Sequence, residues 1–123
     1  MCRIFITEDE QIIAEDIKYT LINFGYEVVG TAISGEDAIR EIENTRPDVV
    51  LMDIMLAGEM NGIETVRYLN DRFAIPVIYI TAYSDKRTMD EAFDTDPEGF
   101  LIKPIKEKQL FAAIEMAFKR NQV

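Results

Sequence analysis

The amino-acid sequence predicts an α/β protein with an open, parallel five-stranded sheet and helices on both faces. Two observations favour this class. Short apolar, β-branched runs alternate five times with amphipathic stretches, the pattern of strands joined by crossover helices. The runs at 49–52 and 77–80 are apolar throughout rather than at alternate positions, which is typical of parallel strands covered on both faces.

The elements follow in order along the chain. Strands are expected at residues 3–7, 26–32, 48–52, 76–80 and 99–102. Each connection carries apolar residues at helical spacing, which predicts a helix with one face in the core. These core-facing positions are Ile13, Ile17, Leu21 and Phe24; Ala38, Ile39 and Ile42; Ile63, Val66 and Leu69; Met89, Ala92 and Phe93; and Leu110, Ile114, Ala117 and Phe118.

Local signals indicate where the helices begin and end. Gly25 follows the first helical stretch, where a left-handed residue commonly ends a helix. Ser34, with Asp37 three residues later, resembles a capping box for the second helix, and Pro47 closes that connection. Ser84 is placed to cap the fourth helix.

Length and composition limit the classes of function. With 123 residues, 48% of them hydrophobic, residues 1–123 are expected to form a single domain. The net charge of −10 disfavours direct binding of nucleic acid. The single Cys2 forms no internal disulfide, no export leader is recognisable, and charges interrupt every apolar run, so a cytoplasmic protein that does not span the membrane is expected. Histidine is absent, so any phosphohistidine must come from another molecule.

Polar residues follow four of the predicted strands. Glu8 and Asp9 follow the first, Asp53 the third, Thr81 the fourth and Lys103 the fifth. Because the carboxyl ends of parallel strands meet at one edge of the sheet, where ligands generally bind, these five side chains are expected to converge.

The convergence predicts a magnesium site with a nucleophile. Three adjacent carboxylates require a cation, and Lys103 supplies a single positive charge. Mg²⁺ suits oxygen ligands with room for water. Asp53 would then be a nucleophile toward a phosphoryl group, with Lys103 and Thr81 stabilising charge on its oxygens.

Each residue also has an ordinary structural interpretation. Asp9 alone would cap the first helix, Glu8 would be a solvated strand end, and Lys103 a surface lysine. Asp53 and Thr81 alone would be turn residues. The functional interpretation is preferred because independent caps and turns do not require all five residues to share one edge.

At these residues the chain resembles the receiver domain of two-component response regulators. The matching segments, in order, are FITEDE (5–10), PDVVLMD (47–53), MNG (60–62), PVIYITA (76–82) and GFLIKP (99–104). The resemblance covers nearly the whole chain and implies a flavodoxin-like three-layer sandwich with strand order 2-1-3-4-5.

The resemblance implies a role for each edge residue. Asp53 is the phosphoacceptor and a direct Mg²⁺ ligand together with Asp9, and Glu8 reaches the ion through water. The backbone carbonyl of Met55 is the third protein ligand of the ion, and its N–H contacts the phosphoryl group. The phosphoryl oxygens are also bound by Thr81, Lys103 and the N–H of Ala82.

The resemblance also implies a switch. Phosphorylation draws Thr81 inward, Phe100 changes rotamer, and the surface of the fourth helix, fifth strand and fifth helix changes. The alternative is that Phe100 is simply a core residue. Family members hold the peptide bond before Pro104 in the cis form, and cis is expected here.

Partners and activity follow from the same resemblance. The phosphoryl donor is a sensor histidine kinase or a histidine phosphotransfer protein. Homodimerisation through the fourth helix, fifth strand and fifth helix, and an output domain after Val123, are both compatible with it. The chain is expected to catalyse its own phosphorylation and dephosphorylation and not to be an enzyme otherwise.

Three other classes fit the sequence less well. An aspartate-nucleophile phosphatase carries its nucleophile after the first strand, with an acid two residues later. A flavodoxin-like cofactor binder needs a Ser-, Thr- and Gly-rich loop there, whereas residues 8–10 are all acidic. A degenerate receiver, acting without phosphate, would lack some of the five edge residues.

The chain departs from the commonest receiver pattern in two places. Glu8 replaces a frequent aspartate, and the loop at 55–62 is one residue longer and lacks the customary proline. Met55 and Tyr83 lie where side chains influence access of the hydrolytic water, and their bulk predicts slow loss of phosphate.

Overall fold

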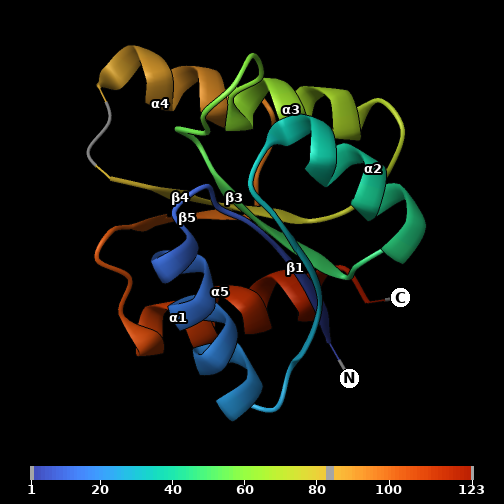
Figure 1. Ribbon diagram of the computed structural model, residues 1–123, viewed down its shortest axis with the longest axis vertical. Helices are drawn as coiled ribbons and strands as arrows, with labels where there is room; N and C mark the ends of the chain where they lie inside the picture. The colour runs from blue at the N-terminus through green and yellow to red at the C-terminus, as the bar shows by residue number, and fades with distance from the viewer. Residues whose placement is uncertain (1, 83–84, 123) are drawn as a thin grey trace.

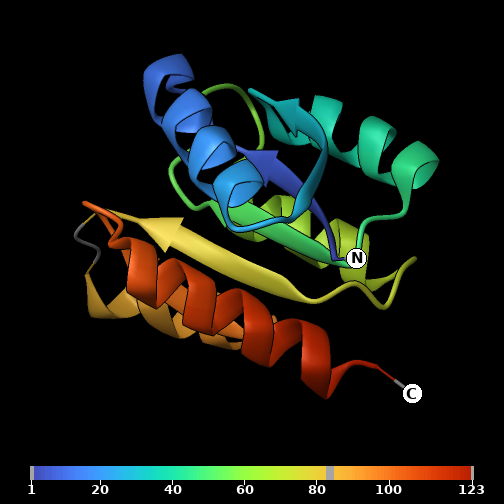
Figure 2. The same ribbon diagram turned by 90° about the horizontal axis from the view of Figure 1, so that it is seen from below.

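Five parallel strands form one sheet in the order β2-β1-β3-β4-β5, the order that the family resemblance implied (Figure 1). The computed structural model describes residues 2–82 and 85–122. The strands are β1 (Arg3–Thr7), β2 (Glu27–Ala32), β3 (Val49–Asp53), β4 (Val77–Thr81) and β5 (Gly99–Ile102). The described ends of the chain lie on the side where the strands begin, away from the edge where they end (Figure 2).

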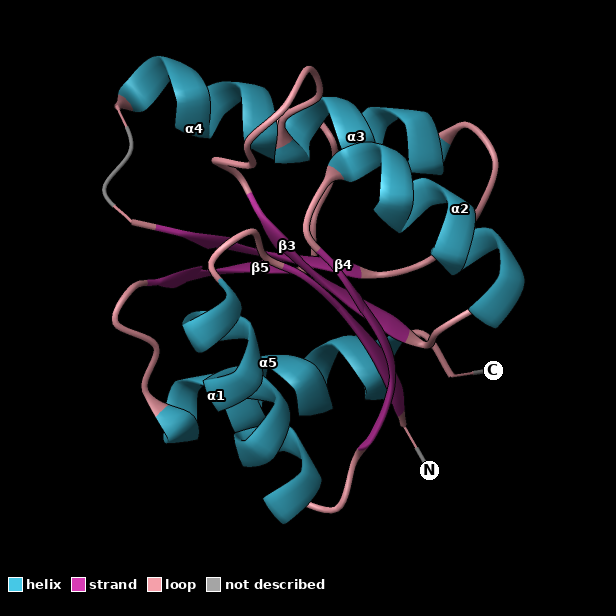
Figure 3. Cartoon of the chain, viewed as in Figure 1, coloured by secondary structure: helices cyan, strands magenta, loops and turns pink. Residues whose placement is uncertain are grey.

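Helices cover both faces of the sheet, so the fold has three layers (Figure 3). They are α1 (Gln11–Asn23), α2 (Gly35–Thr45), α3 (Gly62–Asn70), α4 (Lys86–Phe93) and α5 (Glu107–Arg120). The helices α1 and α5 lie on one face, and α2, α3 and α4 on the other. Within the described residues, no helix is both long and apolar enough to cross a bilayer.

The sheet separates two hydrophobic cores, because successive side chains of a strand point to opposite faces. In β1, Ile4 and Ile6 pack with Leu21 of α1 and Ile114 of α5. Between them, Phe5 packs on the other face, in the cluster that contains Ile42 of α2, Val66 of α3 and Ala92 of α4. The continuous apolar runs of β3 and β4 are thus buried from both sides.

Two strands are shifted by one residue along the chain from the prediction, and β2 begins at Glu27 rather than at residue 26. The third strand ends at Asp53 rather than residue 52, and the fourth at Thr81 rather than residue 80. Backbone pairing continues past both positions: the Ile54 N–H donates to the Ile80 carbonyl at 3.0 Å, and the Lys103 N–H donates to the Thr81 carbonyl at 2.8 Å. The polar site residues therefore lie inside the hydrogen-bonded sheet.

Most of the predicted helix ends are confirmed. Gly25 follows α1 with a φ of 93°, and Ser34 Oγ accepts a hydrogen bond from the Asp37 N–H at 3.2 Å. The structure adds a full capping box at α3, in which Asn61 and Glu64 each bond the other's backbone N–H. This Asn-x-x-Glu signal is visible in the sequence but was missed.

The start of α4 differs from the prediction. Asp85 is its N-cap, accepting from the Thr88 N–H at 2.8 Å. The predicted cap, Ser84, and Tyr83, to which a role in phosphate loss was assigned, lie outside the described residues.

The prediction that Phe93 belongs to the core is wrong. It was expected to face inward with Ala92, but Phe93 is 58% exposed whereas Ala92 is fully buried. Adjacent helical residues point about 100° apart, so with Ala92 directed at the sheet the Phe93 side chain is turned toward the solvent-exposed side of α4. The Phe93 ring lies at the rim of the core, with its centroid 4.8 Å from that of Phe100.

Candidate functional site

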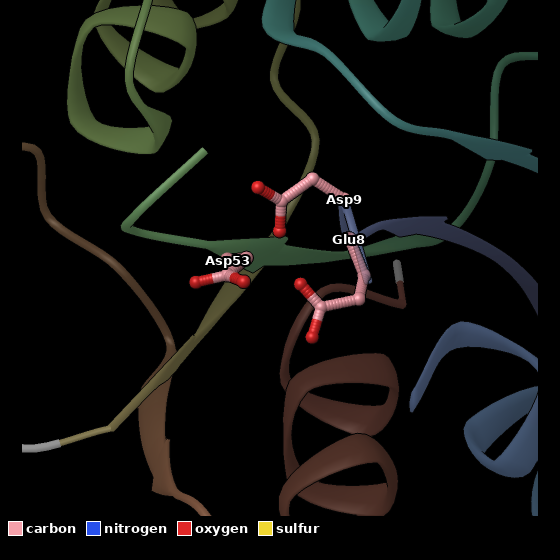
Figure 4. A group of neighbouring side chains, drawn as sticks. All are labelled: Glu8, Asp9 and Asp53. Carbon is pink, nitrogen blue, oxygen red and sulfur yellow. The ribbon is translucent and has the colours of Figure 1, made fainter. Parts of the chain in front are cut away.

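Three carboxylates meet at the edge where the strands end. Glu8 and Asp9 follow β1, and Asp53 is the last residue of β3, the strand next to β1. One carboxylate oxygen from each lies within 4.8 Å of the other two. Figure 4 shows the three side chains turned toward a common space. The predicted convergence of these residues is what the structure shows.

Lys103 completes the cluster from the end of β5. Its Nζ lies 2.8 Å from Glu8 Oε1 and 3.1 Å from Asp53 Oδ2. The Lys103 side chain is 17% exposed, so the surface-lysine interpretation is wrong. The Lys103–Pro104 peptide bond is cis, the isomer expected from the sequence.

Glu8 is a buried carboxylate. It is 1% exposed, which overturns the interpretation as a solvated strand end. Burial, together with a hydrogen bond that the protonated Glu8 carboxyl donates to Asp53, raises the pKa of Glu8 to about 8, although Lys103 opposes the shift. Burial would lower the pKa of Lys103, but its hydrogen bonds with Glu8 and Asp53 outweigh burial and raise it. Lys103 therefore keeps its positive charge over the pH range in which Glu8 loses its proton.

The loop after β3 donates two backbone N–H groups to the carboxylates. Asp53 Oδ1 accepts from the Met55 N–H at 3.0 Å, and Asp9 Oδ2 accepts from the Ala57 N–H at 3.1 Å. The capping interpretation of Asp9 is therefore wrong, since the N-cap of α1 is Glu10. Nothing in the sequence pointed to Ala57, because its backbone rather than its side chain makes the contact.

Gly62 lets α3 begin directly beside Asp53. A Cβ at Gly62 would lie 2.1 Å from the Asp53 carbonyl oxygen and 2.9 Å from Ile54 Cα. Both are backbone atoms, which have little freedom to move aside. A glycine is required here so that the loop of residues 54–61 can return to the end of β3.

Thr81 and Phe100 lie on neighbouring strands beside this cluster. Thr81 is fully buried at the end of β4, one residue after Ile80, the β-ladder partner of Asp53. Ala82 follows at the exposed edge. Phe100 on β5 is half-buried, and its ring stacks on that of Tyr79 with centroids 5.5 Å apart.

The donor set fits a small, hard cation. Hard cations such as Mg²⁺ prefer carboxylate and carbonyl oxygens, and three carboxylates converge here. Glu8 Oε2 is buried and has no hydrogen-bond partner among the described residues. An orphaned buried carboxylate oxygen is costly, and a metal-bound water or the ion itself would satisfy it.

Comparisons with known proteins agree with this geometry. The sequence profile of the response regulator receiver domain matches residues 4–115. The transcriptional regulatory protein PdtaR of Mycobacterium tuberculosis is 33% identical over 118 residues, covering 96% of this chain and 57% of that protein. The DNA-binding response regulator MtrA of Mycobacterium leprae is 32% identical over 121 residues, or 97% of this chain and 52% of that protein. The chain thus spans little more than half the length of these relatives.

Solved structures of receiver domains also superpose closely on this chain. The signal receiver domain of a modulated diguanylate cyclase from Desulfovibrio desulfuricans G20 superposes with a TM-score of 0.93 and 36% identity, covering 98% of this chain and 95% of that one. The receiver domain of a signal transduction histidine kinase from Syntrophus aciditrophicus superposes with a TM-score of 0.88 and is 29% identical. The match covers 99% of this chain and 93% of that one. With the matched profile, the strand order and the acidic edge in agreement, this chain belongs to the receiver domain family of two-component response regulators.

Proposed function

We propose that this receiver domain is a phosphoacceptor switch in which Asp53 carries the phosphoryl group. The observation that supports this best is the environment of Asp53. Its two carboxylate oxygens are held separately, one by the Met55 N–H and the other by Lys103 Nζ. A carboxylate held in this way is oriented for in-line attack without first having to be ordered.

In the proposed transfer, an Asp53 carboxylate oxygen attacks the phosphorus of a phosphohistidine on the donor protein. The new O–P bond forms as the P–N bond breaks, and the electron pair leaves on the imidazole nitrogen. Lys103 offsets negative charge on the phosphoryl oxygens, and Thr81 and the Ala82 N–H bind those oxygens afterwards. The donor is a sensor histidine kinase or a histidine phosphotransfer protein.

The acidic cluster would hold Mg²⁺ for this reaction. Asp9, Asp53 and the Met55 carbonyl would be direct ligands, with Glu8 bound through water. When bound, the ion neutralises charge on the carboxylates and the phosphoryl group. Without a cation, the carboxylates of Asp9 and Asp53 would repel an incoming phosphate.

The proposed output is a change in the surface formed by α4, β5 and α5. Occupancy of Asp53 would draw Thr81 toward the phosphoryl group and release Phe100 to change rotamer. This surface would act on a partner, a second copy or an output domain, and the domain itself would not bind nucleic acid or membrane. Its chemistry would be limited to its own phosphorylation and dephosphorylation.

Asp53→Asn tests the proposal. Wild-type protein with Mg²⁺ and a small phosphodonor should gain the mass of one phosphoryl group, and its removal by neutral hydroxylamine would identify it as an acyl phosphate. Asp53→Asn should gain none. Asp71→Asn, which changes an exposed carboxylate beyond α3, should react like wild type. Phosphorylation that persists in Asp53→Asn would refute the assignment.

A further inference from the structure

We infer that Phe93 is the outer member of a three-ring stack, Phe93–Phe100–Tyr79, through which the state of Asp53 alters the exposed surface of α4. The inference rests on the proposed function. It identifies Phe93 as the residue on α4 whose surroundings change when the switch operates. It concerns the response of the Phe93 ring when Phe100 moves, not the movement of Phe100 itself.

The stack runs from solvent to core. Phe93 is 58% exposed, and Tyr79 is fully buried. Phe100 lies between them: its ring is stacked on Tyr79 with centroids 5.5 Å apart, and the Phe93 ring is tilted by 56° against it with centroids 4.8 Å apart. Both separations are within the range of favourable aromatic pairs. A ring held from both sides is bound more firmly in its present position than a ring that rests only on the sheet.

The inner ring is fixed by a hydrogen bond. The Thr95 hydroxyl donates to the Ala92 carbonyl at 2.6 Å. Because a hydroxyl has one hydrogen, the 2.7 Å contact between Tyr79 Oη and Thr95 Oγ1 must have Tyr79 as donor. Burial raises the pKa of Tyr79 to about 12, so this proton is retained. Tyr79 is thus tied to the turn that ends α4, and the stack and the helix share one anchor.

Strand register connects the stack to the proposed phosphorylation site. Phe100 lies opposite Tyr79 in the β4–β5 ladder, and Thr81 is two residues beyond Tyr79. Residues two apart on a strand share a face, so Thr81 and both rings lie on the same side of the sheet. If Phe100 moves toward Thr81, the Phe100 ring is displaced along β4 and away from the Phe93 ring. Phe93 then loses its contact with the Phe100 ring while Tyr79 stays fixed.

In the described arrangement Lys103 Nζ pairs with Asp53 Oδ2 at 3.1 Å, a contact that a phosphoryl group on Asp53 would replace, so we assign the three-ring contacts to the resting state. Removing the Phe93 ring should therefore favour the activated state. The removal of one aromatic pair shifts such an equilibrium by roughly fivefold. Phe93→Leu, which keeps apolar bulk, should bind beryllofluoride in the presence of Mg²⁺ with about fivefold higher apparent affinity than wild type.

Phe111→Leu is the matched control. Phe111 is 41% exposed on α5 and packs against Phe24 and Tyr26, so its ring lies on the side of α5 that meets the end of α1 and the start of β2, not on the proposed switching surface. Its substitution should leave beryllofluoride affinity unchanged. An affinity of Phe93→Leu that equals that of wild type or Phe111→Leu, or falls below it, would overturn the inference.

Aromatic NMR of the wild-type protein gives an independent measurement. Beryllofluoride should shift the ring signals of Phe93 and Phe100 strongly and those of Phe111 little. Shifts at Asp53 and Lys103 with an unmoved Phe93 ring would contradict the inference and leave the proposed function standing. Absence of any wild-type response, including at Asp53, would instead refute the proposed function and the inference with it.

Discussion

Carboxylates are ordinarily exposed, but the Glu8 side chain is buried. Its electrostatic environment is set by two neighbours, Lys103 and Asp53. Lys103 provides a hydrogen-bonded counter-charge at 2.8 Å, while Asp53 adds a like charge nearby. Buried charges are tolerated when paired, but one lysine faces two carboxylates here. The site is therefore electrostatically unsatisfied unless a proton or a cation is added.

This imbalance predicts a pH dependence of stability in metal-free protein. The pKa of Glu8 is about 8 in the folded chain against an ordinary value of 4.5, so between these values the folded state binds the extra proton. The free energy of unfolding should then fall as the pH rises from about 5 to about 8. Glu8→Gln, a neutral analogue, should remove a loss on the order of 4 kcal/mol from that range.

Urea unfolding in EDTA at several pH values measures this effect. The informative quantity is the difference between wild type and Glu8→Gln, because both share every other titrating group. Mg²⁺ should reduce the difference by stabilising the ionised carboxylate. Parallel pH curves for the two proteins without metal would show that Glu8 does not carry an elevated pKa.

The end of α4 shows how one turn joins a helix to the sheet. Thr95 accepts from Tyr79 and donates to Ala92, and its own carbonyl accepts from Asn70 Nδ2 at 2.8 Å. The sequence of this segment indicates only an ordinary connection between a helix and a strand. The bonds to Tyr79 and Asn70 link residues distant in sequence, so no local pattern could have indicated them.

Two substitutions separate the roles of Tyr79 and Thr95. Tyr79→Phe removes one hydrogen bond and should lower the free energy of unfolding by about 1 kcal/mol. Thr95→Val should cost more, about 2–3 kcal/mol, because it removes two bonds and leaves the buried Tyr79 hydroxyl without an acceptor. In the Thr95→Val background, Tyr79→Phe should cost nothing or stabilise. Chemical denaturation of wild type, the two single variants and the double variant completes the cycle. If the two changes in the free energy of unfolding simply add in the double variant, the hydrogen bond between Tyr79 and Thr95 is refuted.

Asp96, just after this turn, has a φ of 57°, a left-handed conformation that L-residues with a side chain adopt at a cost. Asp96→Gly should therefore raise the free energy of unfolding by about 0.5 kcal/mol, the relieved strain less the entropy of glycine. Thermal unfolding measures it. A destabilised variant would show that the Asp96 side chain contributes more than its backbone costs.

Arg46 provides the comparison, since its φ is 47°. Its side chain donates to the Glu43 carbonyl at 3.0 Å, and its guanidinium lies 4.6 Å from the centre of the Phe73 ring. Arg46→Gly would remove both interactions, so no gain in stability is expected there.

Over the whole molecule, one sheet is shared by two cores, and this predicts cooperative unfolding. Ile42→Ala in the α2 face and Ile114→Ala in the α5 face each delete a fully buried side chain. Each should lower the free energy of unfolding by about 2–5 kcal/mol. Ile12→Ala, at a position 87% exposed, should change it little.

Two probes test whether the faces unfold together. Far-UV circular dichroism follows the helices, and tyrosine fluorescence is unobscured because the chain has no tryptophan. The transitions should coincide in wild type and in both core variants. Separate transitions would contradict the expectation that residues 1–123 behave as one domain.

The sequence by itself determined the fold class, the five strands to within one residue at each end, and the residues that share the acidic edge. It could do so because apolar periodicity is local and because parallel strands necessarily end at the same edge. The tertiary structure decided what depends on distant neighbours: the burial of Glu8, the Ala57 contact to Asp9, the outward position of Phe93 and the ring stack from Phe93 to Tyr79. Burial and side-chain contacts are set by which elements pack together, and that information is not contained in any single stretch of the chain.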